Sequence, residues 1–574
     1  MMLVTVNMVI GQNSSLPKNE TKIYNENIFV HANNTTLVAG ETLHCKFYCL
    51  NAPTNNFSSN SKIARVEIVN NEKQIISSDK VYLENGTGEG DFFIPTTIET
   101  GNYKLIAYTN WMLNNKISKA SITDLIIINP YTTSNKKQTQ SSTQENKENK
   151  EKSTESQSTT INSSTKNQLF ALEINKKTAS KREQITLKIK SLNNLDNKGS
   201  FSLSIKKTNN LPFKKQINSY EFAKSNTEDN SNNPATFLPE VRGEIISGTI
   251  KNNKDPNQIA DKNVALSLPG KAFAFKVAKT NQNGKFNFIL DKSPNYSNAI
   301  IQVIENDRND YTVEIDKNYG YNLAEIKQDE DFYLTSDYKT SLEERSIANQ
   351  IENAYYHLKK DSVQTDAKTF PFFHPLQKEY ILDDYTRFPT LKETTIEIVK
   401  EMYYREESKN FTLHVRDINR DINFFSEPSL VLVDGLLVQN TNELIDLKMD
   451  NIYKISLVPG IYFYGPTAFD GIISFTTKNN DYNAKEKGSY ILKTEIQRPL
   501  NKIIPFKQDY SETKFDRVPD YRYQLLWEPE LSLEEKEKTI SFFTSDVSGQ
   551  YEINLEGFTK DGIPVSLKES FEVK

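Results

Sequence analysis

The residues Leu430-Val431-Leu432-Val433-Asp434-Gly435-Leu436-Leu437-Val438 form two apolar runs on either side of a tight turn. Asp-Gly at the centre favours a type I′ hairpin, because both central positions of that turn need a positive φ. Strand-like apolar runs follow at residues 455–458 and 472–476, with a helix-like stretch at 442–449 between hairpin and strands. Residues 388–478 are therefore predicted to form an α+β unit.

Strand-like runs also fill most of the chain around this unit. In residues 26–130 short apolar runs alternate with turn residues, which predicts an antiparallel β-sandwich. The glycine-rich stretch 85–90 precedes a strand-like run instead of a helix, so it is interpreted as a turn and not as a phosphate-binding loop. The same reasoning predicts a small β-domain at residues 169–235, a further sandwich at 241–328 and a C-terminal β-domain at 488–574.

Two segments have helical periodicity. Residues 341–360 begin with Ser341 and Glu344 at the spacing of a capping box, and residues 340–380 are predicted to form a helical connector. A second helix is predicted at residues 389–404, ahead of the hairpin. The apolar stripe expected on the first helix consists of Leu342, Ile347, Ile351, Ala354, Tyr355 and Leu358.

Residues 131–168 form the clearest boundary in the chain. From residue 132 to residue 168, Ile161 is the only hydrophobic residue, and Ser, Thr, Asn, Gln, Lys and Glu make up the rest. Such a segment cannot bury enough apolar surface to offset its ordering entropy, so it is predicted to be a disordered linker. The first sandwich is therefore expected to be held on a tether.

Residues 1–12 are mostly apolar and close in Val9-Ile10-Gly11 before a polar stretch. They resemble the end of a secretory signal with a small residue at its cleavage site, but no basic segment precedes them. Two interpretations stay open, namely a truncated signal-like segment and a simple apolar N-terminus.

The composition excludes several classes of protein. The 574 residues carry a formal net charge of −5, so there is no overall basic charge of the kind that nucleic-acid binding requires. Hydrophobic residues make up 36%, the mean hydropathy is −0.62, and no apolar run approaches the roughly 20 residues of a transmembrane helix. At about 150 residues per domain, the length predicts about four domains.

The cysteines and histidines form no pattern typical of a metal or catalytic site. Cys45 and Cys49 lie on one predicted strand with their Cα atoms about 13 Å apart, too far for a disulfide, and His44 points to the opposite face. Both cysteines are interpreted as buried structural thiols. The histidines are scattered without a metal-ligand spacing, so no metal site is predicted at His31, His44, His357, His374 or His414.

Structural roles also account for the noteworthy carboxylates. Asp383 and Asp384 are adjacent, and neighbours on an extended chain point in opposite directions, so a turn or cap role is favoured over acid–base catalysis. Asp434 has a complete role in the hairpin turn. Because nucleophile-elbow, P-loop and Cys-x-x-Cys motifs are all absent from the sequence, the chain is predicted to be no enzyme and to bind no cofactor.

Two of the sandwich regions resemble known families. Residues 28–31 (Ile-Phe-Val-His), 38–43 (Val-Ala-Gly-Glu-Thr-Leu) and 101–112 resemble the macroglobulin MG2-type domain of Bacteroidota envelope proteins. Residues 244–290 resemble the carboxypeptidase regulatory-like domain, which is a transthyretin-like sandwich.

Residues 385–480 resemble the TonB-dependent receptor plug domain. This resemblance rests on the hairpin with Asp434 and Gly435, on the run that ends in Gly465, and on the last strand, which Gly471 begins. Members of that family follow the plug with a 22-stranded barrel. Only residues 479–574 follow here, which at about ten residues per strand are too few for closure, and no TonB box is evident. The resemblance therefore implies a plug domain without a barrel of its own.

The chain also departs from the reactive members of these families. Neither cysteine lies next to the Glu-Gln of a thioester, and the close His and Glu spacing of zinc carboxypeptidases is missing. Neither covalent trapping nor zinc-dependent hydrolysis is expected.

The sequence thus predicts a mainly β protein, a string of antiparallel β-sandwiches of macroglobulin/Ig-like and transthyretin-like type plus one α+β plug-like domain. The expected function is non-catalytic binding of protein partners, as an accessory or plug subunit of a separate outer-membrane β-barrel complex for secretion, assembly or uptake. The alternative is a structural or adhesive cell-surface protein that binds glycan or matrix. The expected location is the cell envelope, in association with the outer membrane on its periplasmic or surface face.

Overall fold

The computed structural model describes most of the chain, and its described part is mainly β, as predicted. Its α-helices are α1 (Ser219–Ser225), α2 (Lys339–Ala354) and α3 (Leu391–Glu397). The predictions for residues 1–12 and for most of 131–168 lie outside the described residues. The described residues are 25–114, 120–132, 169–192, 198–227, 236–292, 294–316, 320–330, 332–364, 369–407, 410–417, 425–511 and 513–574.

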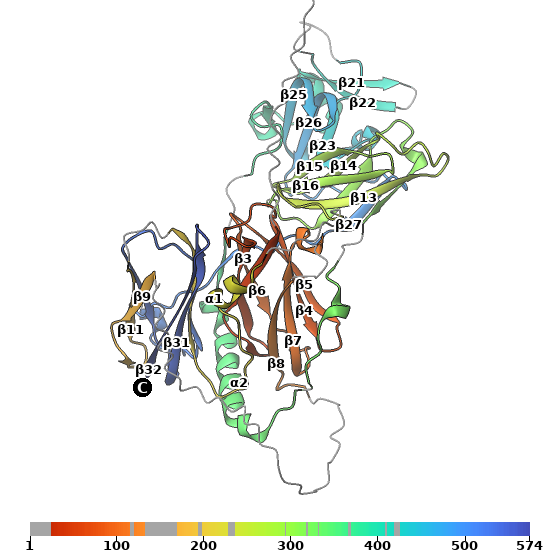
Figure 1. Ribbon diagram of the computed structural model, residues 1–574. Coiled ribbons are helices and arrows are strands. Elements are labelled where there is room, and N and C mark those ends of the chain that lie inside the picture. The colour runs from red at the N-terminus through yellow and green to blue at the C-terminus, as the bar shows by residue number, and fades with distance from the viewer. Residues whose placement is uncertain are drawn as a thin grey trace, which may run out of the picture.

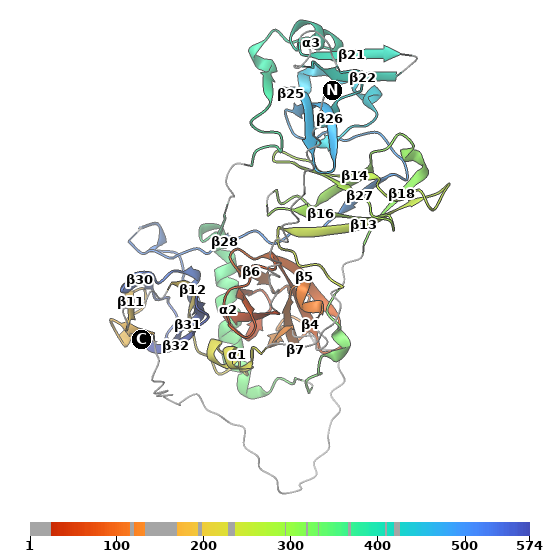
Figure 2. The ribbon, with the colours of Figure 1, turned by 45° about the horizontal axis from the view of Figure 1, so that its top comes forward.

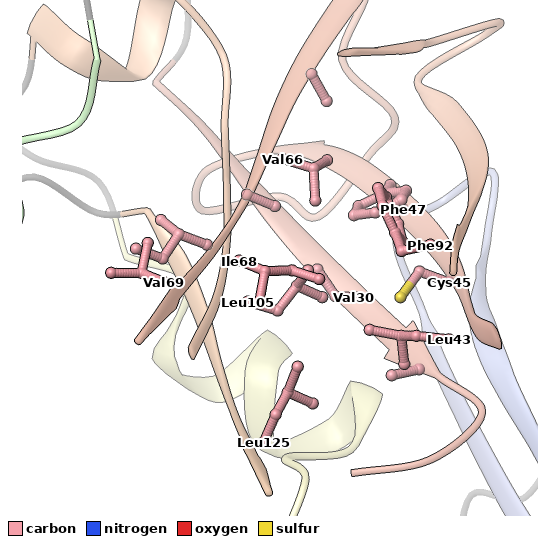
Figure 3. Packing of buried hydrophobic residues seen from close by; sticks show 14 of the residues in the cluster. Val30, Leu43, Cys45, Phe47, Val66, Ile68, Val69, Phe92, Leu105 and Leu125 are labelled. Atoms are coloured by element: carbon pink, nitrogen blue, oxygen red, sulfur yellow. The ribbon is translucent and has the colours of Figure 1, made fainter. Parts of the chain in front are cut away.

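The first sandwich packs a three-stranded sheet on a five-stranded sheet. Apolar residues alternate along the strands, so that Cys45 and Phe47 of one sheet face Ile68 and Leu105 of the other in a shared core (Figure 3). One sheet has the order β1 (Glu26–Ala32), β3 (Thr42–Asn51), β6 (Thr87–Phe93), and the other β2 (Thr36–Val38), β8 (Ser121–Ile128), β7 (Gly101–Tyr108), β4 (Ile63–Asn70), β5 (Ile75–Tyr82).

The second sandwich is assembled from two segments that lie far apart in the sequence. Strand β12 (Gly199–Lys207) pairs on one side with β31 (Gly549–Thr559) and on the other with β29 (Gln524–Leu531). The prediction of two separate domains at 169–235 and 488–574 is therefore wrong, because the strands of both segments share sheets and one core. The remaining strands are β9 (Phe170–Ile174), β10 (Thr178–Ala179), β11 (Gln184–Ser191), β30 (Glu537–Phe543) and β32 (Pro564–Val573).

The third sandwich also takes a strand from a distant segment. Strand β27 (Ile491–Glu495) pairs with β17 (Asn298–Val303), so these residues, predicted to belong to the C-terminal domain, complete this sandwich instead. One sheet has the order β16 (Lys285–Leu290), β13 (Glu244–Asn252), β18 (Tyr311–Ile315), and the other β15 (Ala274–Lys279), β14 (Asn263–Leu268), β17, β27.

The α+β domain has a five-stranded mixed sheet. Its order is β20 (Lys378–Ile381), β25 (Ile452–Tyr464), β26 (Thr467–Thr477), β23 (Leu430–Val433), β24 (Leu436–Leu437), and β23 runs parallel to β26. Helix α3 and the hairpin of β21 (Met402–Glu407) and β22 (Asn410–Val415) contribute to the core on one face of the sheet.

The unbroken apolar run of β23 is explained by burial on both faces of this sheet. Val431 and Val433 point into the domain's own core. Leu430 and Leu432, which alternate with them, point into a second apolar cluster that the third sandwich completes. A strand that is covered on both sides has no solvent face, so it carries no polar alternation.

Several helix predictions need correction. Helix α2 begins at Lys339, before the expected capping residue Ser341, and no side chain caps its first turn. After α2 the predicted helical connector contains a 3-10 turn at Tyr356–Leu358 and the short strand β19 (Ser362–Val363), and its last residues form strand β20. Helix α3 is shorter than predicted, because Met402 already begins strand β21. The helix-like stretch 442–449 contains a 3-10 turn at Thr441–Leu444 and the first residue of another at Met449–Asn451.

The first sandwich is docked against the second, contrary to the predicted tether. The two lie side by side with α2 along them, and the third sandwich and the α+β domain lie together at the other end of the molecule (Figures 1 and 2). Phe29 and Tyr48, on the outer face of β1 and β3, pack against Phe558 of β31. His31 and Ser202 share a hydrogen bond of 2.6 Å across the same contact.

Candidate functional site

The Asp-Gly turn between β23 and β24 has the predicted conformation. Asp434 and Gly435 both have positive φ, 51° and 84°. The buried carboxylate of Asp434 accepts hydrogen bonds from the Thr477 backbone N–H at 2.8 Å, the Thr477 hydroxyl at 2.7 Å and the Tyr482 N–H at 3.1 Å. Asp434 therefore fastens the turn to the end of β26, which is a structural role.

The same turn docks on the third sandwich. The carbonyl oxygen of Asp434 accepts a hydrogen bond of 3.0 Å from the N–H of Gly270, and Leu437 N–H donates to the Ser267 hydroxyl at 3.2 Å. A Cβ atom on Gly435 would lie 2.2 Å from the Cβ of Phe273. Only a residue without a side chain allows the two domains to approach this closely.

The second predicted glycine, Gly465, lies at the same junction. It forms the turn of the β25–β26 hairpin, and a Cβ there would lie 3.0 Å from the carbonyl oxygen of Val277 in β15. Next to it, the Tyr464 hydroxyl donates to the Phe275 carbonyl at 2.6 Å. The turns that contain Gly435 and Gly465 thus both contact the third sandwich, at Phe273 and at strand β15, which follows it.

Gly471, the third predicted glycine, lies elsewhere, on the internal side of the sheet. Its φ is +79°, and a Cβ would lie 1.9 Å from a methyl carbon of Val415 in β22. Gly471 therefore sets the distance between β26 and β22 and takes no part in the junction.

Replacing Gly435 by alanine is expected to lower the free energy of unfolding by about 2–4 kcal/mol, because the positive φ and the contact with Phe273 both oppose a side chain. Thermal unfolding followed by circular dichroism measures the effect. Gly101→Ala is the matched control, since a Cβ there meets no atom closer than 3.8 Å. If the two variants lowered the unfolding temperature equally, this account of the junction would be contradicted.

Sequence reasoning missed the aromatic loop that completes the junction. Phe372 packs against Tyr464 in a tilted arrangement with ring centroids 4.3 Å apart, and Phe373 is buried in the cluster between the two domains. Gln302 of β17 adds a hydrogen bond of 2.9 Å to the Leu437 carbonyl. The aromatic run at residues 370–373 was the available signal, since such residues seldom crowd together in an exposed linker.

The outer part of the β25–β26 hairpin has an exposed apolar face. Tyr462 and Tyr464 point inward to Phe372, whereas the alternating residues Ile461 and Phe463 point away and are 52% and 80% exposed. A phenylalanine at this exposure has almost no intramolecular contact to lose. It is therefore a candidate anchor for another molecule.

The cysteines and histidines lie in structural positions. Cys45 and Cys49 are free and buried, and burial raises the pKa of each thiol well above its usual value. His44 pairs with Asp91 at 2.6 Å, and His414 is buried against the Glu427 carbonyl. His31 lies in the contact between the first two sandwiches, and His357 and His374 are exposed.

The described residues bring together no group of three or more His, Cys, Asp or Glu side chains that could hold a metal ion. Asp383 accepts from Arg387 at 2.9 Å within a 3-10 turn, in keeping with the turn role predicted for it. Two hollows in the described surface, one beside Asn102 and Asp329 and one beside Asn295 and Asn501, each have a volume of about 10 Å³, which is room for one water molecule.

In the part of the chain that the structure describes, no helix is both long and apolar enough to cross a bilayer. No family model matches the chain, and no curated protein matches it either.

Solved structures similar to the chain include bacterial alpha-2-macroglobulins. One from Escherichia coli is 9% identical over 96% of this chain and 44% of its own, with a TM-score of 0.24, and one from Salmonella is 8% identical over 96% and 39%, also at 0.24. The adhesin InvE of Yersinia pseudotuberculosis is 10% identical over 50% of this chain and 57% of its own, at 0.14. The chain spans less than half the length of these macroglobulins. Such scores are too low to assign a function.

Proposed function

We propose that this chain is a non-catalytic protein of the cell envelope, associated with the outer membrane, and that its α+β domain and sandwiches bind protein partners. In this proposal the α+β domain is a plug-like module that docks on, or occludes, a separate β-barrel for secretion, assembly or uptake. Its resemblance to the plug domain of TonB-dependent receptors motivates the choice of partner.

The observation that carries the proposal is the exposed apolar face of the β25–β26 hairpin. The other large apolar surfaces of the α+β sheet are already covered, one by the domain's own core and one by the third sandwich. Phe463, at 80% exposure, and Ile461 remain for a contact with another protein. Burial of a Phe side chain in a partner's pocket contributes about 2 kcal/mol or more.

Affinity purification of the tagged full-length protein from detergent-solubilised outer membranes tests the proposal. We expect a β-barrel protein to co-purify, and Phe463→Asp to reduce its recovery about tenfold or more, because a buried contact would then hold an unpaired charge. Recovery of the chain without a barrel protein would contradict the proposed function.

Ile289→Asp is the matched control. Ile289 is also a large apolar residue on a strand, 38% exposed, but it lies on β16 of the third sandwich. The control should leave recovery unchanged. If both variants reduced it equally, the loss would reflect added charge and not the hairpin surface.

A further inference from the structure

Apolar clusters join the parts of the molecule in two pairs. Phe29 and Phe558 pack in a cluster that the first and second sandwiches share, and Phe275 and Leu432 lie in a cluster that the third sandwich shares with the α+β domain. Within the described residues, no apolar cluster contains side chains from both the first and the third sandwich. The molecule thus has a lower half, with the first two sandwiches and α2, and an upper half, with the third sandwich and the α+β domain (Figures 1 and 2).

The contact between the two halves is polar. Lys80 of the first sandwich donates to the Glu244 carboxylate of the third at 2.6 Å and to the Gln497 carbonyl at 3.0 Å. The Lys62 N–H donates to the Glu240 carbonyl at 2.9 Å. An interface that is not large and hydrophobic leaves two domains free to move relative to one another.

Two buried polar atoms at this contact have no hydrogen-bond partner among the described residues. They are Oε2 of Glu240 and Nε of Arg498. A buried polar group without a partner has lost its hydration for no return. The charges of Lys80 and Glu244 have lost their hydration as well, which offsets much of the attraction between them. Separation of the halves restores water to all of these groups, so an open state is close in free energy to the closed one.

We propose that the chain is a two-state hinge whose lower and upper halves separate at the contact of Lys80 with Glu244. The structure shows the closed state, and the open state is populated on the order of 10%, at the upper end of the usual range for a minor conformation. The apolar clusters keep each half rigid while the angle between the halves changes. Opening redirects the hairpin of Phe463 relative to the first two sandwiches, whatever that hairpin binds.

Distances between spin labels, measured by double electron–electron resonance on the full chain, test the hinge. Thr97 of the first sandwich and Asn283 of the third are exposed, so Thr97→Cys with Asn283→Cys reports on the angle between the halves. Thr97→Cys with Ser541→Cys, on exposed residues of the first and second sandwiches, is the control pair within the lower half. The native thiols of Cys45 and Cys49 are buried, so they should not take up the label.

Glu244→Gln should open the hinge. It removes the negative charge and keeps the shape of the side chain, so the ratio of open to closed molecules should rise about tenfold or more, as expected for the loss of a charge-assisted pair. The distance distribution between the halves should broaden, whereas that of the control pair should not. Lys80→Met with Glu244→Leu and Arg498→Met makes the contact apolar and should give one narrow distribution between the halves.

Three results would overturn the hinge. The first is a distribution between the halves that Glu244→Gln leaves unchanged. The second is equal broadening of the control pair, because the sandwiches themselves would then have loosened. The third is equal width in the unchanged chain and in the Met, Leu, Met variant, a comparison that holds even if Glu244→Gln does not fold. Glu314→Gln, in an exposed ion pair of the same sandwich, is the matched control and should leave both distances unchanged.

Discussion

Replacing Glu244 by alanine is expected to lower the free energy of unfolding by about 3–5 kcal/mol. The carboxylate of Glu244 accepts a hydrogen bond of 2.6 Å from Lys80 and is also paired with Arg498. The side chains of Glu244, Lys80 and Arg498 are only 1%, 3% and 4% exposed. Removal of the carboxylate leaves two buried cations without the counter-charge to which both are bonded, and that desolvation cost is large.

The triad also connects separate parts of the molecule. Lys80 belongs to β5 of the first sandwich, Glu244 begins β13 of the third, and Arg498 follows β27 and donates to the Asp291 carbonyl at 2.6 Å. Loss of Glu244 should therefore loosen the contact between these sandwiches. Hydrogen exchange of the β5 and β13 amides should accelerate more than that of β11, in the second sandwich.

Glu314→Ala is the control for Glu244→Ala, measured by urea unfolding. Glu314 is also a glutamate of the third sandwich with a lysine partner, but in its pair with Lys251 both side chains are more than half exposed, at 53% and 60%. Such a surface pair contributes about 0–1 kcal/mol. Exchange of all three buried groups for Met, Leu and Met should recover much of the stability, because none of the three buried charges of the triad then remains. A Glu244→Ala effect no larger than that of Glu314→Ala would contradict the role of the triad.

The turns and single strands were predictable because each is encoded by a few neighbouring residues. The Asp434-Gly435 turn follows from two residues that tolerate positive φ. The strands around it follow from apolar runs. Strand pairing between distant segments had no such signal, since the alternation of β12 fits any partner equally well, and β31 lies more than 300 residues further along the chain.

The junction and the position of α2 depend on contacts that the sequence pattern does not contain. Gly435 was recognisable as a turn residue, but its approach to Phe273 is a property of two packed domains. Helix α2 was expected to carry an apolar stripe, and Ile347 and Ala354 of that stripe are exposed. The carboxylate of Glu41 instead holds Arg345 inward, because a buried guanidinium needs both that charge and the Thr36 carbonyl.

Stability is expected to rise as the pH is lowered from about 8 to about 5.5. Burial raises the pKa of three carboxyl groups, Glu89, Glu240 and Glu556, from 4.5 to about 7. All three lie where parts of the molecule meet. Glu89 is on β6 near Lys46 and Lys502, in the region where the first sandwich meets β29.

The other two carboxyl groups have comparable surroundings. Glu240 faces Arg65, Lys80 and Glu244 at the contact of the first and third sandwiches, and its carbonyl accepts from the Lys62 N–H at 2.9 Å. Glu556 accepts from the Ser219 N–H of α1 at 3.0 Å and from the Ser566 hydroxyl at 2.7 Å. For each carboxyl group, burial raises the pKa by more than the nearby hydrogen-bond donors and cations lower it.

The direction of the effect follows from proton uptake. Between pH 4.5 and pH 7 the folded chain binds protons at these carboxyls that the unfolded chain does not, so stability falls as the pH rises through this range. Above pH 7, ionisation of each buried carboxyl lowers the free energy of unfolding by an amount of the order of 3 kcal/mol. His31 acts in the opposite direction, because burial lowers its pKa from 6.5 to about 3 and its stabilising contribution is lost as the pH falls below 6.5. Burial also lowers the pKa of His414, which acts in the same direction as His31. The two histidines offset only part of the effect of the three carboxyls.

Urea unfolding at pH 8, 7 and 6 measures this dependence. The Glu→Gln variants at positions 89, 240 and 556 should each remove about a third of the gain in stability between pH 8 and pH 6, because glutamine does not titrate and keeps the shape of the side chain. The exposed Glu314→Gln variant should keep the full gain. A stability that rises with pH over this interval would mean that these carboxyls are ionised in the folded chain. Because the three groups lie at contacts between parts of the molecule, a fall in stability at high pH should be accompanied by faster hydrogen exchange at those contacts before the sandwich cores exchange.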